Sequence, residues 1–313
     1  MIGETANIQV AFDNVDPTDA GFGPFIDVYL PRNGVDGVGG VGADGISYVA
    51  SSASYLGASV TTTVLVFPDD GAGTGTVSHP YAVDITGAPL DVIGPAGDQL
   101  LVFELPFGSF TATQPAASIS FQTDVSNLAD LSSVLTLRAR SGFRYGNDAL
   151  DNPTSGDVSL VSQASVDPTS WSPAAGITPT LVQLTKTYIG PENETATGPN
   201  FPRQFQIDID VADGQTITNA DVIDLLPNNI ELISIDSITP SGTATNFPTP
   251  TPINAPNNEL VVTIPTLTGT ASTNDATVVF SYFVPFRDAD SATVIDPSSG
   301  NDVTSENLSL IHI

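Results

Sequence analysis

The sequence predicts an all-β protein made of two tandem β-sandwich domains. Short β-branched or alternating runs, bounded by Gly, Pro, Asn and Asp, recur along all 313 residues. Helical periodicity is nearly absent, although 40% of the residues are hydrophobic. Each half carries about seven such runs, which is the pattern of a β-sandwich.

The first half contains one expected strand after another, with loops rich in Gly, Asp and Pro between them. We expect strands at 6–12, 25–30, 59–67, 99–105, 117–123, 134–140 and 157–163. Only the pattern of 125–132 favours a short helical turn.

The second half repeats this organisation. We expect strands at 180–188, 203–211, 220–225, 231–238, 259–264, 276–284 and 301–310. In 203–211, Phe205, Ile207 and Ile209 alternate with polar residues, so the apolar side chains should face a core.

Residues 167–179 are predicted to join the domains, because three prolines and a glycine there favour a stiff linker. The expected organisation is therefore a domain at 1–166, a linker at 167–179 and a domain at 180–313. Trp171 is the only tryptophan in the sequence. We expect it to pack against one of the domains; stacking on a ligand is the alternative.

Charge and composition exclude several functions. Seven Lys and Arg residues face 35 Asp and Glu residues, for a net charge of −28. Nucleic acid is excluded as a partner because phosphate binding needs basic side chains, and anionic membranes are disfavoured for the same reason. The absence of cysteine excludes disulfides, thiolate metal sites and cysteine nucleophiles.

The same composition is typical of a secreted bacterial protein, located outside the cell or at its surface. No apolar run approaches the ~20 residues of a membrane span. We expect a piece of a longer chain without its signal peptide, whose partners are neighbouring domains of that chain and cell-surface or matrix components. Residues 309–313 also resemble a translated sequencing adapter.

Residues 180–310 carry a series of features in a recognisable order. A strand with Leu184-Thr185-Lys186 comes first, the segment from Ala220 to Leu232 contains Asp224-Leu225-Leu226-Pro227, and an expected last strand begins at Asn301. The region resembles the Ig-like conserved repeat domain (DUF11) of bacterial surface proteins and the related isopeptide-forming fimbrial domain. It lacks the family's Asn-Thr-Ala tripeptide after the final asparagine. Residues 1–170 resemble, more loosely, β-rich regions of large surface proteins.

This resemblance implies an autocatalytic cross-link between a lysine and an asparagine. Lys186, the only lysine in the chain, would be the nucleophile, Asn301 the electrophile and Asp224 the buried acid. Asn307 is the alternative electrophile, because its even spacing from Asn301 puts it on the same strand face. The competing interpretation is that Asp224 closes a turn, that Lys186 is exposed, and that the domain is a spacer without a cross-link.

Acidic turns suggest calcium as a possible ligand, although no cofactor is required. Asp36 and Asp44 are the best pair, and Asp13–Asp16 and Asp69–Asp70 are further oxygen-rich loops. None has EF-hand spacing, and Asp-Gly is also a favoured hairpin turn.

Catalytic motifs are absent from the sequence, so we expect no enzyme. The chain has two histidines, and His79, before Pro80, has no obvious partner. Arg138 and Arg140 share a strand face. They could bind a carboxylate of a ligand, or they could balance the negative charge of the nearby Asp148, Asp151 and Asp157.

These observations favour a structural or adhesive segment, a stalk or spacer, of a large surface protein. The alternative is a carbohydrate- or ligand-binding module whose site lies in the first domain. A third hypothesis is an accessory region of a hydrolase.

Overall fold

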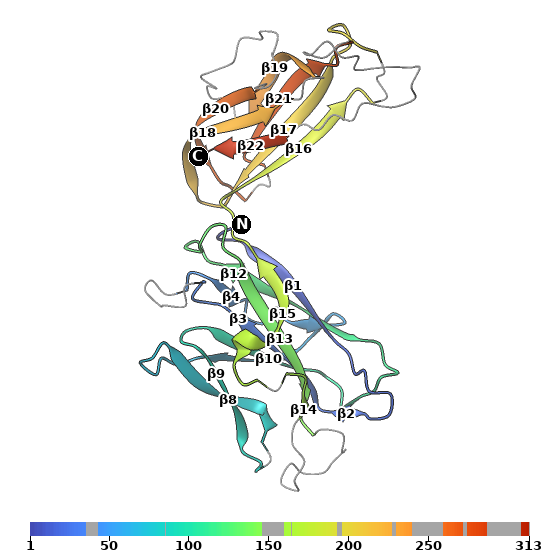
Figure 1. Ribbon diagram of the computed structural model, residues 1–313, viewed down its shortest axis with the longest axis vertical. Coiled ribbons are helices and arrows are strands. Elements are labelled where there is room, and N and C mark those ends of the chain that lie inside the picture. Colours follow the sequence, from blue (N-terminus) through green and yellow to red (C-terminus); the bar gives the residue numbers. More distant parts are fainter. Residues whose placement is uncertain are drawn as a thin grey trace. The chain divides into compact units, whose positions relative to one another are not determined.

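The protein is almost entirely β-structure, which confirms the predicted fold class. The computed structural model describes residues 1–35, 43–84, 86–145, 160–163, 165–192, 196–226, 230–239, 259–271, 274–286 and 308–312. Residue contacts divide the chain into two compact units, Met1–Thr180 and Leu181–Ile313 (Figure 1).

The first unit is organised around one central sheet, in the order β14-β13-β3-β10-β7, with β15 also paired to β13. Its strands are β3 (Pro24–Leu30), β7 (Thr61–Val66), β10 (Gln99–Glu104), β13 (Leu135–Phe143), β14 (Leu160–Val161) and β15 (Ser172–Ile177).

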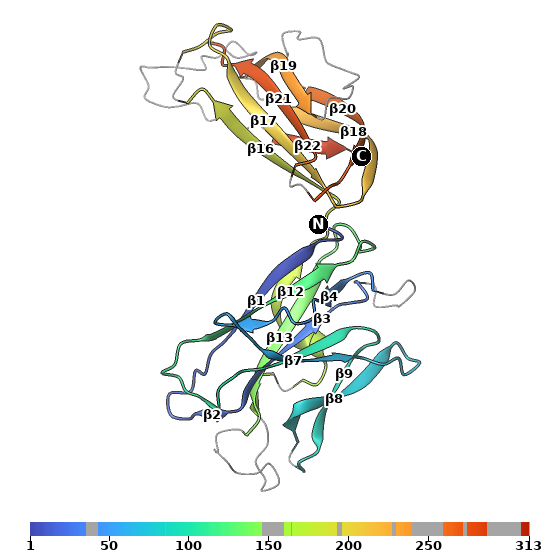
Figure 2. The ribbon, with the colours of Figure 1, turned by 180° about the vertical axis from the view of Figure 1, so that it is seen from behind.

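A second sheet of this unit is built on the antiparallel pair of β1 and β12, which lie side by side in Figure 2. β4 and β5 also pair with β12, and β6 pairs with β5. The strands are β1 (Thr5–Phe12), β4 (Ile46–Tyr48), β5 (Ser54–Tyr55), β6 (Ala58–Ser59) and β12 (Ala117–Val125). Two separate hairpin pairs are β2 (Gly21–Phe22) with β11 (Ser109–Phe110), and β8 (Thr74–Val83) with β9 (Pro89–Pro95).

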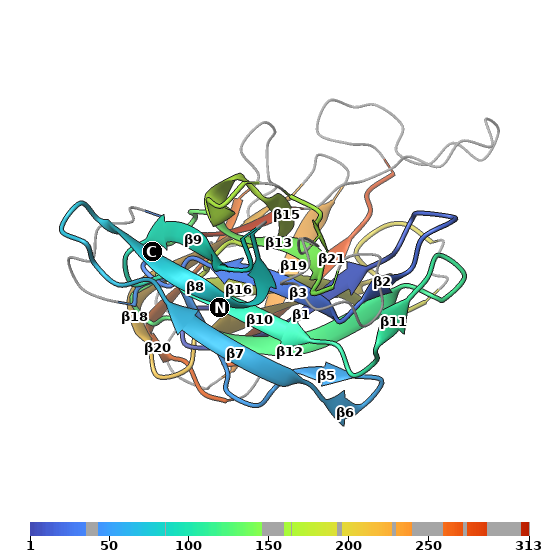
Figure 3. The same cartoon turned by 90° about the horizontal axis from the view of Figure 1, so that it is seen from below.

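The central sheet is covered on both faces. All seven residues of β3 are buried, which a strand exposed on one face would not show. On one face, Phe103 of β10 packs against Phe121 of β12, with ring centroids 5.1 Å apart. The other face is covered by the β8–β9 hairpin and by Trp171, and Figure 3 shows β8 beside β7. The first unit therefore has three layers.

The segment expected to be a linker belongs to this first unit instead. Residues Pro168–Ser170 form the short 3-10 helix η2, and β15 pairs with β13 from Leu135↔Ile177 onward. Proline is tolerated here because β15 lies at the edge of the sheet, where a residue without an N–H need not break a hydrogen bond between strands. Trp171 is 1% exposed, as expected for a tryptophan packed against a domain.

The two ends of the first unit meet. The Ile2 N–H donates to the Thr180 carbonyl at 3.1 Å, and the Ser132 N–H donates to the Pro179 carbonyl at the same distance. The chain therefore enters and leaves this unit at the end where β13 begins. The segment 125–132, expected to form a helical turn, consists of non-helical turns between β12 and β13.

The second unit consists of a four-stranded sheet, β16-β17-β21-β19, and a three-stranded sheet, β20-β18-β22. The strands are β16 (Val182–Gly190), β17 (Arg203–Val211), β18 (Thr216–Leu225), β19 (Glu231–Thr239), β20 (Glu259–Thr268), β21 (Ala276–Phe283) and β22 (Leu308–His312). One hydrophobic core joins the two sheets. It includes Ile207 and Ile209 of β17, Phe280 of β21, and Val222 and Val262 of the facing sheet. Alternation thus directs apolar side chains inward from both sheets, as the pattern in 203–211 predicted.

Candidate functional site

Lys186 lies on the inward face of β16. The strand alternates between half-buried and exposed residues, and Leu184, Lys186 and Tyr188 occupy its less exposed positions. The lysine side chain is only 12% exposed. The competing interpretation of Lys186 as an exposed lysine does not hold, because the period of the strand turns this position toward the core.

Asp224 faces Lys186 from the other sheet of the second unit. It lies on β18, and its side chain is 1% exposed. The Lys186 ammonium donates to both carboxylate oxygens, with Nζ–Oδ1 and Nζ–Oδ2 distances of 2.7 and 2.8 Å. This interaction joins the two sheets, so Asp224 does more than close the turn before Leu225.

Two aromatic rings complete the surroundings of the amine. Nζ lies 4.7 Å from the ring centroid of Phe205 and 5.3 Å from that of Phe280. Burial lowers the pKa of Lys186 from its ordinary value, while Asp224 raises it and offsets part of that effect. The ion pair is one proton transfer away from a neutral amine beside a carboxylic acid, which is the form that a nucleophilic lysine needs.

The two candidate electrophiles, Asn301 and Asn307, lie outside the described residues. The backbone of β22 pairs with β18 in the register Leu225↔Leu308 and Asp224↔Ser309. Residues of β16 and β22 also approach within 8 Å between Cα atoms. The last described strand thus runs beside both the strand of Lys186 and the strand of Asp224.

The acidic turns hold their carboxylates within local hydrogen bonds. Asp16 Oδ1 accepts from the Thr18 and Asp19 N–H groups, and Asp70 Oδ1 accepts from the Ala72 N–H. These bonds lower the pKa of both aspartates. Asp36 lies outside the described residues, so the proposed pair with Asp44 stays a prediction. Within the described ranges, no group of three or more His, Asp and Glu side chains is arranged to hold a metal.

A buried ionic cluster in the first unit was missed by the sequence analysis. Asp27 Oδ1 lies 2.8 Å from His79 Nε2, and Asp27 Oδ2 accepts from Arg140 Nε at 2.7 Å. All three side chains are 0% exposed. The expectation that His79 has no partner is wrong, because β8 folds over β3 and places it on Asp27.

Backbone hydrogen bonds fix the tautomer of His79. Its Nδ1 accepts from the Tyr81 N–H at 3.1 Å and from the Ala82 N–H at 2.7 Å. The ring proton therefore lies on Nε2 and is donated to Asp27. The ring acts as a neutral bridge between the hairpin and the central sheet.

Arg140 completes this cluster. Its guanidinium lies 4.1 Å from the ring centroid of Trp171, a cation–π contact, and Arg138 donates to the Trp171 carbonyl at 2.9 Å. Both arginines were expected to bind a ligand or to balance the charge of Asp148, Asp151 and Asp157. In the structure they contact Asp27 and Trp171 instead. The other three aspartates lie outside the described residues. No local signal identifies Asp27 as the partner, since 113 residues separate it from Arg140.

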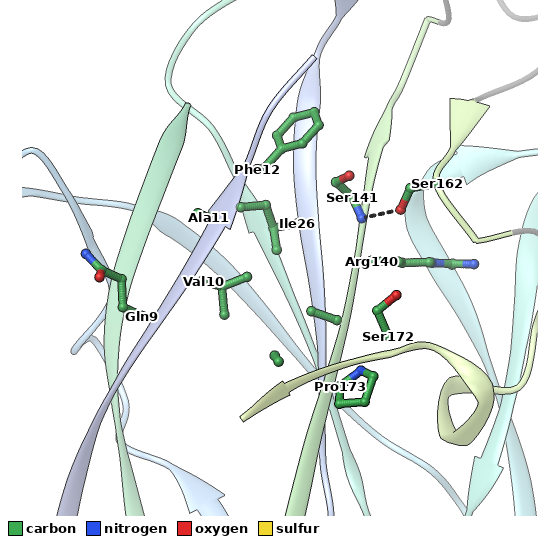
Figure 4. Close-up of a pocket in the computed structure, with 12 residues that line it drawn as sticks. Gln9, Val10, Ala11, Phe12, Ile26, Arg140, Ser141, Ser162, Ser172 and Pro173 are labelled. Atoms are coloured by element: carbon green, nitrogen blue, oxygen red, sulfur yellow. Dashed lines mark hydrogen bonds between the residues drawn. The ribbon is translucent and has the colours of Figure 1, made fainter. Parts of the chain in front are cut away.

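An open groove of about 300 Å³ lies at the edge of the first unit, between β1 and the strands β13 and β15 (Figure 4). Val10 and Ile26 line one side of it, and the Ser141 N–H donates to Ser162 Oγ at 3.0 Å on the other. Arg140 points away from Val10 and Ile26 in Figure 4, toward the opposite face of the sheet. The groove thus gathers hydroxyl groups and apolar surface, and the charged end of Arg140 belongs to the buried cluster.

No family model matches the chain, and no curated protein matches it. Three solved structures with low similarity are domains of bacterial surface proteins. The collagen binding domain of Erysipelothrix rhusiopathiae surface protein RspB is 12% identical, over 98% of this chain and 89% of that one, with a TM-score of 0.21. The C-terminal domain of the Streptococcus agalactiae AgI/II polypeptide BspA is 9% identical, over 90% and 83%, with a TM-score of 0.23.

The third structure, the B domain of a biofilm associated protein, is 10% identical over 99% of this chain and 81% of that chain, with a TM-score of 0.21. At these TM-scores the likenesses carry no argument about this chain. Among the described residues, no helix is long and apolar enough to cross a membrane.

Proposed function

We propose that the chain is a structural segment, a stalk or spacer, of a bacterial surface protein, and that a Lys–Asn isopeptide bond braces its second unit. One observation carries the proposal: Lys186 is buried between Phe205 and Phe280 and contacts both oxygens of a buried carboxylate on the opposite sheet. A lysine needed only for solubility would extend its ammonium into water.

The proposed reaction balances without a metal, cofactor or oxidant. Asp224 takes a proton from the Lys186 ammonium, and the neutral Nζ attacks the side-chain carbonyl carbon of an asparagine. The new Nζ–Cγ bond forms, and Asp224 returns its proton to the amide nitrogen. The Cγ–Nδ2 bond then breaks and ammonia leaves, while the second proton of Nζ passes to Asp224, which ends as the carboxylic acid. Burial favours both neutral forms, the amine and the carboxylic acid.

Chain reach distinguishes the two candidate electrophiles. Asn307 directly precedes Leu308, whose backbone pairs with Leu225 beside Asp224. Asn301 lies eight residues before Ser309 in the sequence, farther along the chain from this register. The register therefore favours Asn307, and Asn301 remains the alternative implied by the family resemblance.

The test is the intact mass of the purified, denatured chain. We expect the wild type to be lighter than its sequence by one ammonia, and proteolytic mapping to find a branched peptide joining Lys186 to Asn307. Lys186→Arg is the matched control, because it keeps a cation opposite Asp224 but has no amine that loses its proton. It should have the full sequence mass.

Variants of the asparagines assign the second partner. Asn307→Ala should restore the full mass, whereas Asn301→Ala should not. A full, unmodified mass for the wild type would overturn the covalent brace and leave a spacer held by its hydrophobic core.

A further inference from the structure

A second concave surface lies in the first unit, where β10 ends and where β3 and β7 begin. We call it the distal groove. Its volume is about 440 Å³, within the ~300–1,000 Å³ that small-molecule sites occupy. It is lined by aromatic and charged side chains from separate segments: Tyr81, Glu104, Phe107, Arg144 and Tyr145.

The aromatic rings in this groove are not packed away into the core. Tyr81, Phe107 and Tyr145 are each half-buried, so part of each ring faces solvent within the concavity. Phe107 is supported from behind by Tyr55 and Phe110, with ring centroids 5.7 and 5.5 Å away. Rings that are fixed on one side and open on the other are suited to stack on a flat apolar ligand face.

Polar groups lie between these rings. The Arg144 guanidinium is 5.7 Å from the ring centroid of Tyr81 and 5.2 Å from that of Tyr145. Glu104 is exposed and accepts a hydrogen bond from the Tyr81 hydroxyl at 3.2 Å. A guanidinium and a carboxylate that line the same groove offer both donors and acceptors, which suit hydroxyl groups.

The position of the groove supports a role in binding. β13 begins near Ser132, where the two ends of the unit meet, and ends at Phe143, directly before Arg144. Its nine residues span ~30 Å. The distal groove therefore lies at the end of the unit opposite its point of attachment.

We propose that the distal groove binds a neutral carbohydrate. One pyranose face would stack on Phe107, and its hydroxyls would bond to Glu104 and Arg144. The net charge of −28 disfavours acidic glycans and nucleic acid, and a sugar combines the apolar face and hydroxyl edge that these residues match. This inference does not depend on the isopeptide bond.

The test is isothermal titration calorimetry of the full chain with three neutral probes: cellohexaose, mannohexaose and a galactose hexasaccharide. We expect saturable binding of at least one probe, weakened at least tenfold by Phe107→Ala. Glu104→Gln keeps the shape of an exposed side chain and should weaken binding without affecting folding. Phe201→Ala, which removes a 42% exposed ring in the second unit, is the matched control and should bind as the wild type.

Two outcomes would overturn the proposal. One is the absence of saturable binding to all three probes at millimolar concentration. The other is binding that both groove variants leave unchanged. A Pro-Pro-Gly repeat peptide is titrated in parallel, and saturation by this peptide without any oligosaccharide would assign the groove to an extended peptide instead. Fluorescence of Trp171, which does not line the groove, checks that each variant retains the fold of the first unit.

Discussion

Among their described residues, the two units each bury an ion pair, but they do so with different cations. The pair of the first unit joins neighbouring strands of one sheet, whereas the pair of the second unit joins two sheets. In the first unit, Arg140 binds Asp27 and its guanidinium packs on Trp171. In the second unit, Lys186 binds Asp224 between Phe205 and Phe280. Both cations contact aromatic rings, and both carboxylates are almost fully buried.

The difference lies in what each cation can become. An arginine stays protonated at any pH a protein survives, so Arg140 has no neutral amine with which to react. A buried lysine can release its proton and become a nucleophile. Buried cations beside aromatic rings therefore differ in what they can do: Arg140 makes a structural contact, and Lys186 carries the reaction that we propose.

The largest effect is expected from Asp27→Ala. This change leaves Arg140 charged and buried without its carboxylate, which costs ~3–5 kcal/mol of unfolding free energy. Urea unfolding followed by Trp171 fluorescence reports the first unit alone, because this is the only tryptophan. Asp91→Ala, at an exposed position on β9 of the same unit, is the control and should shift stability by less than ~0.5 kcal/mol. An equal loss in both variants would contradict the role of the cluster.

A smaller loss is expected from Asp224→Ala in the second unit. Lys186 can then lose its proton, so we expect ~1–3 kcal/mol, nearer the cost of one unsatisfied polar group. Calorimetry resolves this transition from the one that Trp171 reports. The comparison is made in the background Asn301→Ala with Asn307→Ala, which removes both candidate electrophiles. A loss as large as that of Asp27→Ala would mean that the lysine stays charged.

A third buried carboxylate, Asp98 of the first unit, is held by neutral hydrogen-bond donors. It accepts from the Tyr29 hydroxyl at 2.6 Å and from the Asn33 N–H at 2.8 Å. Burial raises its pKa, although these hydrogen bonds lower it in part. Asp98→Asn removes the charge and keeps an acceptor for Asn33, so stability at neutral pH should change by less than ~1 kcal/mol or increase slightly. A loss above ~2 kcal/mol, again by Trp171 fluorescence, would show that the charge itself is required.

The smallest effect is a pH dependence of the second unit. Burial lowers the pKa of Lys186 below its ordinary 10.5, so between the lowered value and 10.5 the unfolded chain binds more protons and stability rises with pH. Burial raises the pKa of Tyr282 to about 12, which acts in the opposite direction. The measured quantity is therefore the difference between Lys186→Met and its parent, both lacking Asn301 and Asn307. Identical pH slopes would contradict the lowered pKa.

Alternation and turn residues were sufficient to predict most strands of both units. The strand expected at 203–211 coincides with β17, because uninterrupted alternation fixes both its face and its bounds. The β8–β9 hairpin was missed, because Gly75, Pro80 and Gly94 interrupt its apolar pattern. Its role as a third layer depends on the central sheet, which local periodicity does not report.

Of the candidate sites, the sequence predicted one and missed the others. The resemblance to surface-protein domains paired Lys186 with Asp224, and the structure brings them together across the sheets. No comparable motif surrounds Asp27, His79 and Arg140, which come from three strands far apart in sequence. The distal groove likewise gathers residues from several segments, so only the fold reveals it.

The meeting of Ile2 and Thr180 has a consequence for how such a protein would respond to tension. A force applied to the chain on either side of the first unit acts on two neighbouring points, so the folded body of the unit adds almost nothing to the distance spanned. Tension would therefore act on the base of this unit and not along its length. A pulling force would act first on the two hydrogen bonds at its base, while the distal groove would remain unloaded.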